Sequence, residues 1–130
     1  MTSTHGKFGT TINCMDGRVQ APVFKYLSDN YQIDYVDTIT EPGPTKALVA
    51  GDSQLIESIK SKVLISVEKH GSSIVAVVAH GDCAGNPIPK DESIIQTRQA
   101  VEVVKSWNLP VTVIGLWVGD ERWIAELITD

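Results

Sequence analysis

The sequence predicts an α/β fold of three layers, in which helices cover both faces of a mainly parallel, doubly wound sheet of four strands with an antiparallel C-terminal edge strand. The first observation behind this prediction is an alternation of short apolar runs with longer stretches whose apolar residues recur at helical spacing. The second is the pair Gly119-Asp120, a turn signal that favours a hairpin near the end of the chain. The length of 130 residues fits one domain, residues 1–130, which can bury a core without a disulfide or a structural metal.

Five strands are expected, and the third is the clearest. Residues 75–79 read VAVVA, an uninterrupted apolar run that is typical of a strand buried on both faces of a sheet. For the last segment a short terminal helix is the alternative, and the sequence leaves it open. The expected strands span residues 8–14, 32–39, 74–80, 111–118 and 122–128.

Three helices are expected between these strands. The first spans residues 19–30, where Pro22 falls in the first turn and is tolerated. The second begins after a cap at Asp52 or Ser53 and ends at Gly71, and the third begins after a cap at Asp91 and stops before Pro110. The prolines and glycine of residues 40–45 and the prolines of residues 84–90 predict loops.

Composition excludes several classes of function. The net charge is -5, and Lys and Arg are scattered along the chain, so no basic stripe predicts a nucleic acid or an anionic membrane as partner. No apolar run approaches the roughly 18 residues that a transmembrane helix needs. Because the first residues also lack an apolar signal segment, a cytoplasmic location is the expectation. No glycine-rich phosphate-binding motif is present, which argues against nucleotide chemistry.

Three soft metal ligands stand at the ends of two expected strands. Cys14 closes the run 8–14, while His80 ends the run 74–80 and Cys83 follows three residues later. Ligands of open parallel sheets bind beyond the carboxyl ends of the strands, where the strand order reverses, so we expect these two ends to meet. Two thiolates and an imidazole are a natural zinc set that leaves a fourth position open. A disulfide between the cysteines, or their burial as small apolar residues, are the alternatives.

Asp16 and Arg18 follow Cys14 closely and have two interpretations. Asp16 could occupy the fourth position of a metal, or it could pair with Arg18, whose planar guanidinium suits a carboxylate. The pair could also be an ordinary surface ion pair in which Asp16 caps the next helix. Asp82 is interpreted as a turn residue, and Trp123 as a core or interface residue.

The two motifs together resemble those of one enzyme family. Cys14-x-Asp16-x-Arg18 and His80-x-x-Cys83 are similar to the C-x-D-x-R and H-x-x-C motifs of β-class carbonic anhydrases, and the chain resembles a short, divergent member of that family. The resemblance implies Zn²⁺ held by Cys14, His80 and Cys83, with Asp16 and Arg18 as a catalytic dyad. It further implies reversible hydration of carbon dioxide to bicarbonate by a zinc-bound hydroxide.

The same resemblance implies a homodimer or a higher homo-oligomer. Carbonyl sulfide or carbon disulfide would suit the same attack on a linear electrophile, and a noncatalytic zinc-binding or regulatory module is the alternative of another class. The chain departs from the family pattern in two places. Ala84 follows the second cysteine where the family usually has glycine, and Thr40-Glu41-Pro42-Gly43 stands where Arg-Asn-Ala-Gly is common. The segment around Glu41 is either a rigid connection or a wall of the site.

Overall fold

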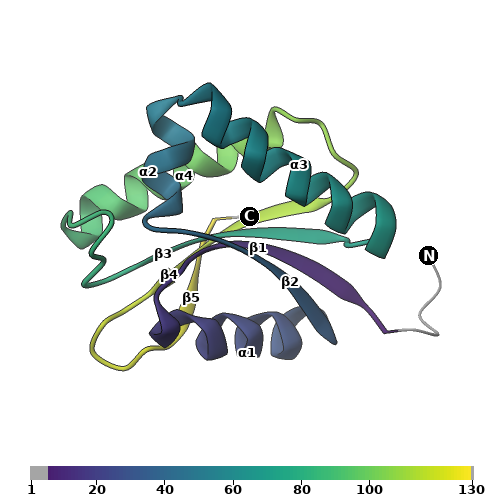
Figure 1. Cartoon of the computed structure of the whole chain (residues 1–130). Helices are drawn as coiled ribbons and strands as arrows, with labels where there is room; N and C mark the ends of the chain where they lie inside the picture. The colour runs from purple at the N-terminus through teal and green to yellow at the C-terminus, as the bar shows by residue number, and fades with distance from the viewer. Residues whose placement is uncertain (1–5, 130) are drawn as a thin grey trace.

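The structure, a computed structural model, describes residues 6–129. Five strands and the helices between them follow the predicted alternation (Figure 1). The strands are β1 (Phe8–Cys14), β2 (Tyr35–Glu41), β3 (Ile74–His80), β4 (Thr112–Val118) and β5 (Ala125–Thr129). The helices are a 3₁₀ turn η2 (Gly17–Val19), α1 (Gln20–Tyr31), α2 (Pro44–Ala50), α3 (Ser53–His70) and α4 (Lys90–Lys105).

The sheet confirms the predicted topology. Its strand order is β2-β1-β3-β4-β5, with β5 antiparallel to β4 and the other pairs parallel. β1 and β3 are direct neighbours, and Thr10 lies opposite Val75 in their register. The chain therefore reverses its direction of winding between β1 and β3, at the place where a ligand site is expected.

Helices cover both faces of the sheet, as predicted. α1 lies against one face, and α2, α3 and α4 lie against the other (Figure 1). Each face has its own apolar core, one including Val23 and Leu27 of α1 and the other Ile59 and Val63 of α3. All seven residues of β3 are buried, which explains why its sequence carries no polar residue before His80.

A helix at residues 44–50 corrects the loop that was predicted for residues 40–45. β2 continues to Glu41, and α2 begins directly at Pro44. Gly43 makes this sharp change of direction with a φ of +65°, a conformation that glycine adopts without a steric cost. Proline is compatible with the first position of a helix, because an N–H at that position has no partner within the helix and its absence therefore costs no hydrogen bond.

The two predicted helix caps differ in outcome. The Asp52 side chain accepts a hydrogen bond from the Leu55 N–H at 3.1 Å, which confirms the cap of α3. The cap predicted at Asp91 is wrong, because Pro89 occupies the N-cap position and Asp91 lies in the first turn of α4. A carboxylate in the first turn still interacts favourably with the helix dipole.

The connection between β4 and β5 is longer than a two-residue turn. β4 ends at Val118 and β5 begins at Ala125, so residues 119–124 form the loop. Within it the Trp123 N–H donates a hydrogen bond to the Gly119 carbonyl at 3.0 Å. The antiparallel edge strand is confirmed, and the alternative of a terminal helix is wrong.

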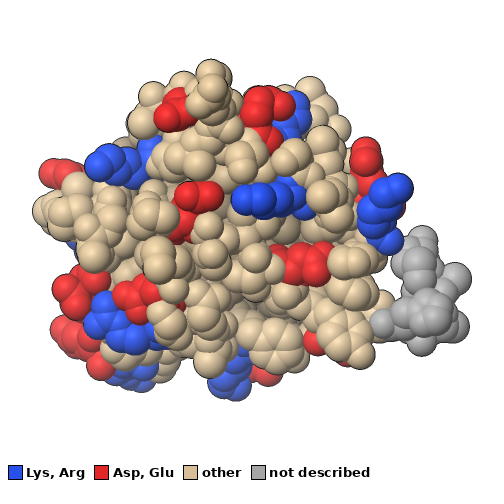
Figure 2. Space-filling model, in the orientation of Figure 1, with Lys and Arg blue, Asp and Glu red and all other residues tan. Residues whose placement is uncertain are grey.

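Charges of both signs are interspersed on the face of the molecule shown in Figure 2. This agrees with the scattered Lys and Arg residues of the sequence. Among the described residues, no helix is both long and apolar enough to cross a membrane.

A partly buried polar network ties α3 to the sheet at the end opposite to Cys14. The Ser66 hydroxyl donates to the Asp37 carboxylate at 2.7 Å, and the His70 ring nitrogen Nδ1 lies 2.6 Å from the same oxygen. Because Ser66 has only one hydrogen to give, the hydroxyls of Thr10 and Ser72, at 2.6 and 2.7 Å, act as donors to it. Asp37 is thus the final acceptor of the network.

Replacement of Asp37 by alanine is expected to lower the free energy of unfolding by about 1–3 kcal/mol, because it leaves the buried Ser66 hydroxyl without its acceptor. Urea denaturation followed by circular dichroism measures this change. Asp29→Ala is the matched control, since within residues 6–129 the Asp29 side chain makes only an exposed ion pair with Lys25, worth about 0.3–0.5 kcal/mol. Equal effects of the two substitutions would contradict the role of the network.

Candidate metal centre

The structure brings Cys14, His80 and Cys83 together at the carboxyl ends of β1 and β3. The three side chains are buried, with exposed fractions of 4%, 5% and 7%. Their ligand atoms all lie within 4.8 Å of one another, so the three residues could hold a metal ion. The two sulfurs are 3.9 Å apart, whereas a disulfide requires about 2.05 Å, so both cysteines are free thiols and the disulfide alternative is wrong.

The imidazole of His80 is oriented by the main chain. Its Nδ1 lies 2.6 Å from the Gly81 carbonyl oxygen, and a carbonyl can only accept, so the proton is on Nδ1. In the neutral ring this tautomer makes Nε2 the acceptor. This nitrogen is buried and has no hydrogen-bond partner among the described residues. A buried acceptor without a partner is costly, and a metal ion would supply the partner that Nε2 lacks.

The thiol of Cys83 lies in surroundings that disfavour its charged form. Burial raises its pKa, and the nearby Cys14 adds to that effect. Both causes act in the absence of a cation, since a buried thiolate then has no opposite charge beside it. A bound cation would reverse this preference, because metals bind the thiolate form of cysteine.

Asp16 and Arg18 pair with each other beside Cys14, His80 and Cys83. The Arg18 Nη2 and Nε atoms donate to the Asp16 carboxylate at 2.7 and 3.0 Å, a two-pronged contact that fixes the relative orientation of the two groups. Asp16 Oδ1 also accepts the Arg18 backbone N–H at 2.9 Å and so caps η2. The ion pair and the helix cap, two alternatives in the sequence, are both present.

The pairing keeps Asp16 ionised. Hydrogen bonds from Arg18, first from its side chain and then from its backbone, lower the pKa of the Asp16 carboxyl from 3.8 to about 2. The same contact raises the pKa of the Arg18 guanidinium. Near neutral pH Asp16 is therefore a carboxylate that can only accept hydrogen bonds.

Two further residues contact Arg18. The Asp82 carboxylate accepts from Nη1 at 3.2 Å, and the Asp82 carbonyl accepts from Nη2 at 3.2 Å. On the face of the guanidinium, the ring of Trp123 lies 4.3 Å from the central carbon. Sequence reasoning treated Asp82 as a turn residue and Trp123 as core or interface, and it missed both contacts. No local pattern signals the approach of a residue 105 positions away.

Two cavities border the cluster. A small one of about 10 Å³, at the lower limit for one water molecule, is lined by residues that include Cys14, His80, Cys83, Gly43, Pro44 and Thr45. The segment after β2 is therefore a wall of the site. On the solvent side, a cavity of about 480 Å³ is lined by residues that include Asp16, Arg18 and Cys83.

The wall of the small cavity is held by a contact between two backbones. A Cβ atom on Gly43 would come within 2.9 Å of the Gly85 carbonyl oxygen, and one on Gly85 within 2.6 Å of the Pro42 carbonyl carbon. The loop after Cys83 and the segment before α2 can pack this closely only because both positions are glycine. Behind them, the Asn86 and Thr45 side chains both donate to the side-chain amide oxygen Oε1 of Gln96, at 2.7 and 3.0 Å.

A comparison with protein families identifies the chain. Residues 4–129 match the family described as "Putative carbonic anhydrase". The chain belongs to this family. The match spans nearly the whole sequence and includes the Cys14, His80 and Cys83 cluster, in agreement with the resemblance inferred from the two motifs.

Solved structures of β-carbonic anhydrases share the fold of this family member. The β-carbonic anhydrase isoform I of Trichomonas vaginalis is 15% identical, with a TM-score of 0.60, over 93% of this chain and 81% of that one. The carbonic anhydrase of Glaciozyma antarctica is 15% identical, with a TM-score of 0.64, over 95% and 83%. CafA of Aspergillus fumigatus is 12% identical, with a TM-score of 0.64, over 95% and 75%. Comparison with curated protein sequences gave no match.

Proposed function

We propose that the protein is a zinc-dependent lyase that hydrates carbon dioxide reversibly to bicarbonate, with Cys14, His80 and Cys83 as the zinc ligands. The observation that carries the proposal is the buried Nε2 of His80, which has no hydrogen-bond partner among the described residues. His80 lies in a cluster with two thiols, in a chain that belongs to a carbonic anhydrase family. A structural role would not require three soft ligands to converge within 4.8 Å.

The geometry of the two sulfurs fits zinc. Sulfur ligands at about 2.3 Å in a tetrahedral site lie about 3.8 Å from each other. The observed Cys14–Cys83 separation is 3.9 Å. The sulfurs are thus already at the spacing that zinc requires, and a single imidazole completes a set of three that leaves the fourth position open.

When bound there, zinc would supply a nucleophile from water near neutral pH and polarise the product oxygen. Asp16 contributes a fixed hydrogen-bond acceptor, because its low pKa keeps it ionised. A water O–H beside Asp16 must therefore point its hydrogen at the carboxylate, which orients the oxygen lone pairs away from it. Arg18 holds both carboxylate oxygens and so keeps Asp16 from turning towards the three ligands.

The proposal includes a homodimer. Its support is two exposed apolar side chains: Met15, which lies between Cys14 and Asp16 in the sequence and is 64% exposed, and Phe24 of α1, which is 44% exposed. A second copy of the chain would remove these side chains from water.

Two measurements on the full chain, purified without chelator, test this function. We expect mass spectrometry to show one equivalent of zinc per chain. After chelation the zinc should be lost, and the thiols of Cys14 and Cys83 should become accessible to thiol reagents. Stopped-flow hydration of carbon dioxide should then show turnover that rises towards alkaline pH, because two thiolates weaken the acidifying effect of the metal.

The outcomes separate the alternatives. If the purified protein contains no zinc and binds none when zinc is added, the metal site itself is rejected. Zinc without hydration, at neutral or alkaline pH, would favour the noncatalytic module, and turnover of carbonyl sulfide or carbon disulfide alone would assign the site to those substrates.

A further inference from the structure

Arg18 is held on three sides, although nearly half of its side chain is exposed. One edge of the guanidinium binds Asp16, the Nη1 and Nη2 atoms reach Asp82, and one face lies on the ring of Trp123. The side-chain exposure of Arg18 is 46%. An arginine this exposed loses rotamer freedom only if its contacts hold it, so the contacts beyond Asp16 need a reason.

The backbone at two of these contacts is unusual. Asp82 and Trp123 have φ angles of +54° and +52°, in the left-handed region. Among the described residues, Gln32 and Asn108 are the other non-glycine positions with positive φ, and both lie just beyond a helix, where this conformation is common. An Asp tolerates it, but a bulky indole residue does not adopt it without strain. The left-handed backbone that no helix end explains thus falls on the two residues that contact Arg18, and at Trp123 it is strained.

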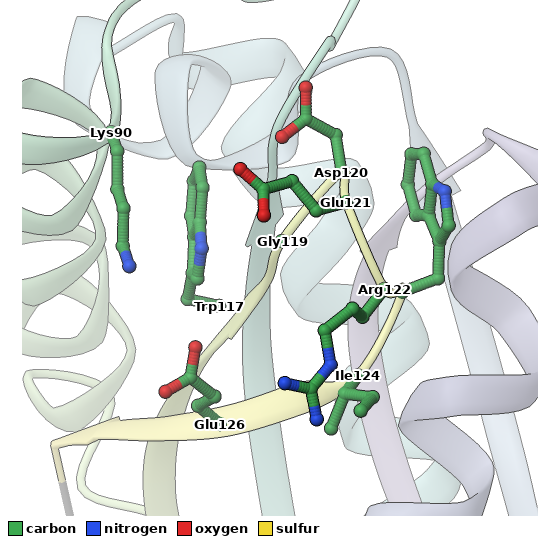
Figure 3. Close-up of a pocket in the computed structure, with 9 residues that line it drawn as sticks. Lys90, Trp117, Gly119, Asp120, Glu121, Arg122, Ile124 and Glu126 are labelled. Carbon is green, nitrogen blue, oxygen red and sulfur yellow. The ribbon is translucent and has the colours of Figure 1, made fainter.

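The loop that carries Trp123 borders a cavity on one side and contacts the segment after His80 on the other. Residues 119–124 line an open cavity of about 480 Å³, in which Figure 3 shows Lys90 and Trp117 across from Arg122 of the loop. On the near side, a Cβ atom on Gly81 would come within 2.7 Å of the Asp120 carboxyl group, so the loop rests closely on the segment that follows His80. The ring of Trp123 also lies 6.2 Å from that of His80. The position of the loop is therefore set by its contacts on the side that faces the Cys14, His80 and Cys83 cluster.

We propose that Trp123 and Asp82 are positioning residues, which hold the Arg18 guanidinium in the plane in which it binds Asp16. The indole face fixes the plane of the guanidinium through a cation–π contact, and Asp82 takes the donors on the side away from Asp16. The Nε and Nη2 edge is thereby left for the Asp16 carboxylate. The catalytic consequence of this arrangement rests on the proposed function, but the arrangement itself does not.

NMR of the full chain as purified tests the arrangement without any activity. The Arg18 Nε–H signal is expected to be shifted upfield by the Trp123 ring and to exchange slowly. In Trp123→Leu the signal should move to the ordinary arginine position, and in Trp123→Phe most of the shift should remain. Ile124→Ala is the control in the same loop, since Ile124 is exposed, and it should leave the signal in place. Equal spectra of Trp123→Leu and Ile124→Ala would overturn the proposal.

Kinetics then test the consequence. In Trp123→Leu we expect kcat for carbon dioxide hydration to fall by about 10-fold, as for other residues that orient a group at a metal site, with KM little changed. Trp123→Phe should restore most of kcat, and Asp82→Asn, which tolerates the left-handed backbone, should lower it by a smaller factor. Glu121→Gln removes an exposed carboxylate of the same loop and should have no effect. An inactive wild-type protein would refute the proposed function, while the NMR result would still decide the positioning.

Discussion

Replacement of Cys83 by alanine is expected to lower zinc affinity by more than 100-fold and to abolish hydration activity. The estimate is a lower bound, because changing groups that merely orient a ligand already costs about 10–100-fold in affinity. Competition against a chromophoric chelator measures the affinity. The substitution should cost the metal-free protein only about 1 kcal/mol of unfolding free energy, a typical value for a point substitution. Loss of zinc from a folded protein is therefore the expected result.

Cys14 offers the matched comparison, since the chain contains no third cysteine. If the two thiols act as one site, Cys14→Ala, Cys83→Ala and the double variant should all lose zinc to a similar extent, because residues that act as a unit are not additive. A site built from both sulfurs would be contradicted if either single variant retained zinc. It would also be contradicted if the loss of zinc affinity in the double variant equalled the product of the two single losses.

Much of the fold could be predicted because its central strands are buried on both faces. β3 carries a continuous apolar run that admits few other structures, and right-handed parallel connections lead to a doubly wound sheet with helices on both faces. The errors fall where a short segment depends on its surroundings. α2 has seven residues and a proline at each side of Gly43, so local pattern favours a loop, and its packing against α4 and β3 decides for a helix.

The candidate site, like the fold, could be predicted from the sequence only in part. Cys14, His80 and Cys83 could be predicted to meet because each stands at the end of a strand or just beyond it, and parallel strands end on one edge of the sheet. The surroundings of Arg18 could not, because they depend on how loops are placed. Trp123 contacts Arg18 because residues 119–124 form a longer connection than the two-residue turn that Gly119-Asp120 indicates. Two left-handed φ angles, at Asp82 and Trp123, mark these contacts and are visible only in the structure.

Removal of Arg18 is expected to leave zinc bound but to lower kcat/KM by about 10²–10³-fold, the usual cost of losing one preorganised charged group at an active site. Two hydrogen bonds from the Arg18 side chain now hold the Asp16 carboxylate, at 2.7 and 3.0 Å. Without them Asp16 is free to turn towards the cluster and compete for the open fourth position. Zinc content and stopped-flow hydration of Arg18→Ala measure the two parts of this expectation, and Arg98→Ala is the control for loss of an exposed arginine.

The double variant decides whether Arg18 acts by restraining Asp16 or by contacting the substrate. An amide is a much weaker competitor for a metal than a carboxylate, so in an Asp16→Asn background the further change Arg18→Ala should cost little. Full loss in the double variant, equal to the product of the two single losses, would show that Arg18 acts independently of Asp16. In that case Trp123 and Asp82 would hold Arg18 for the substrate, and the proposed restraint on Asp16 would be wrong.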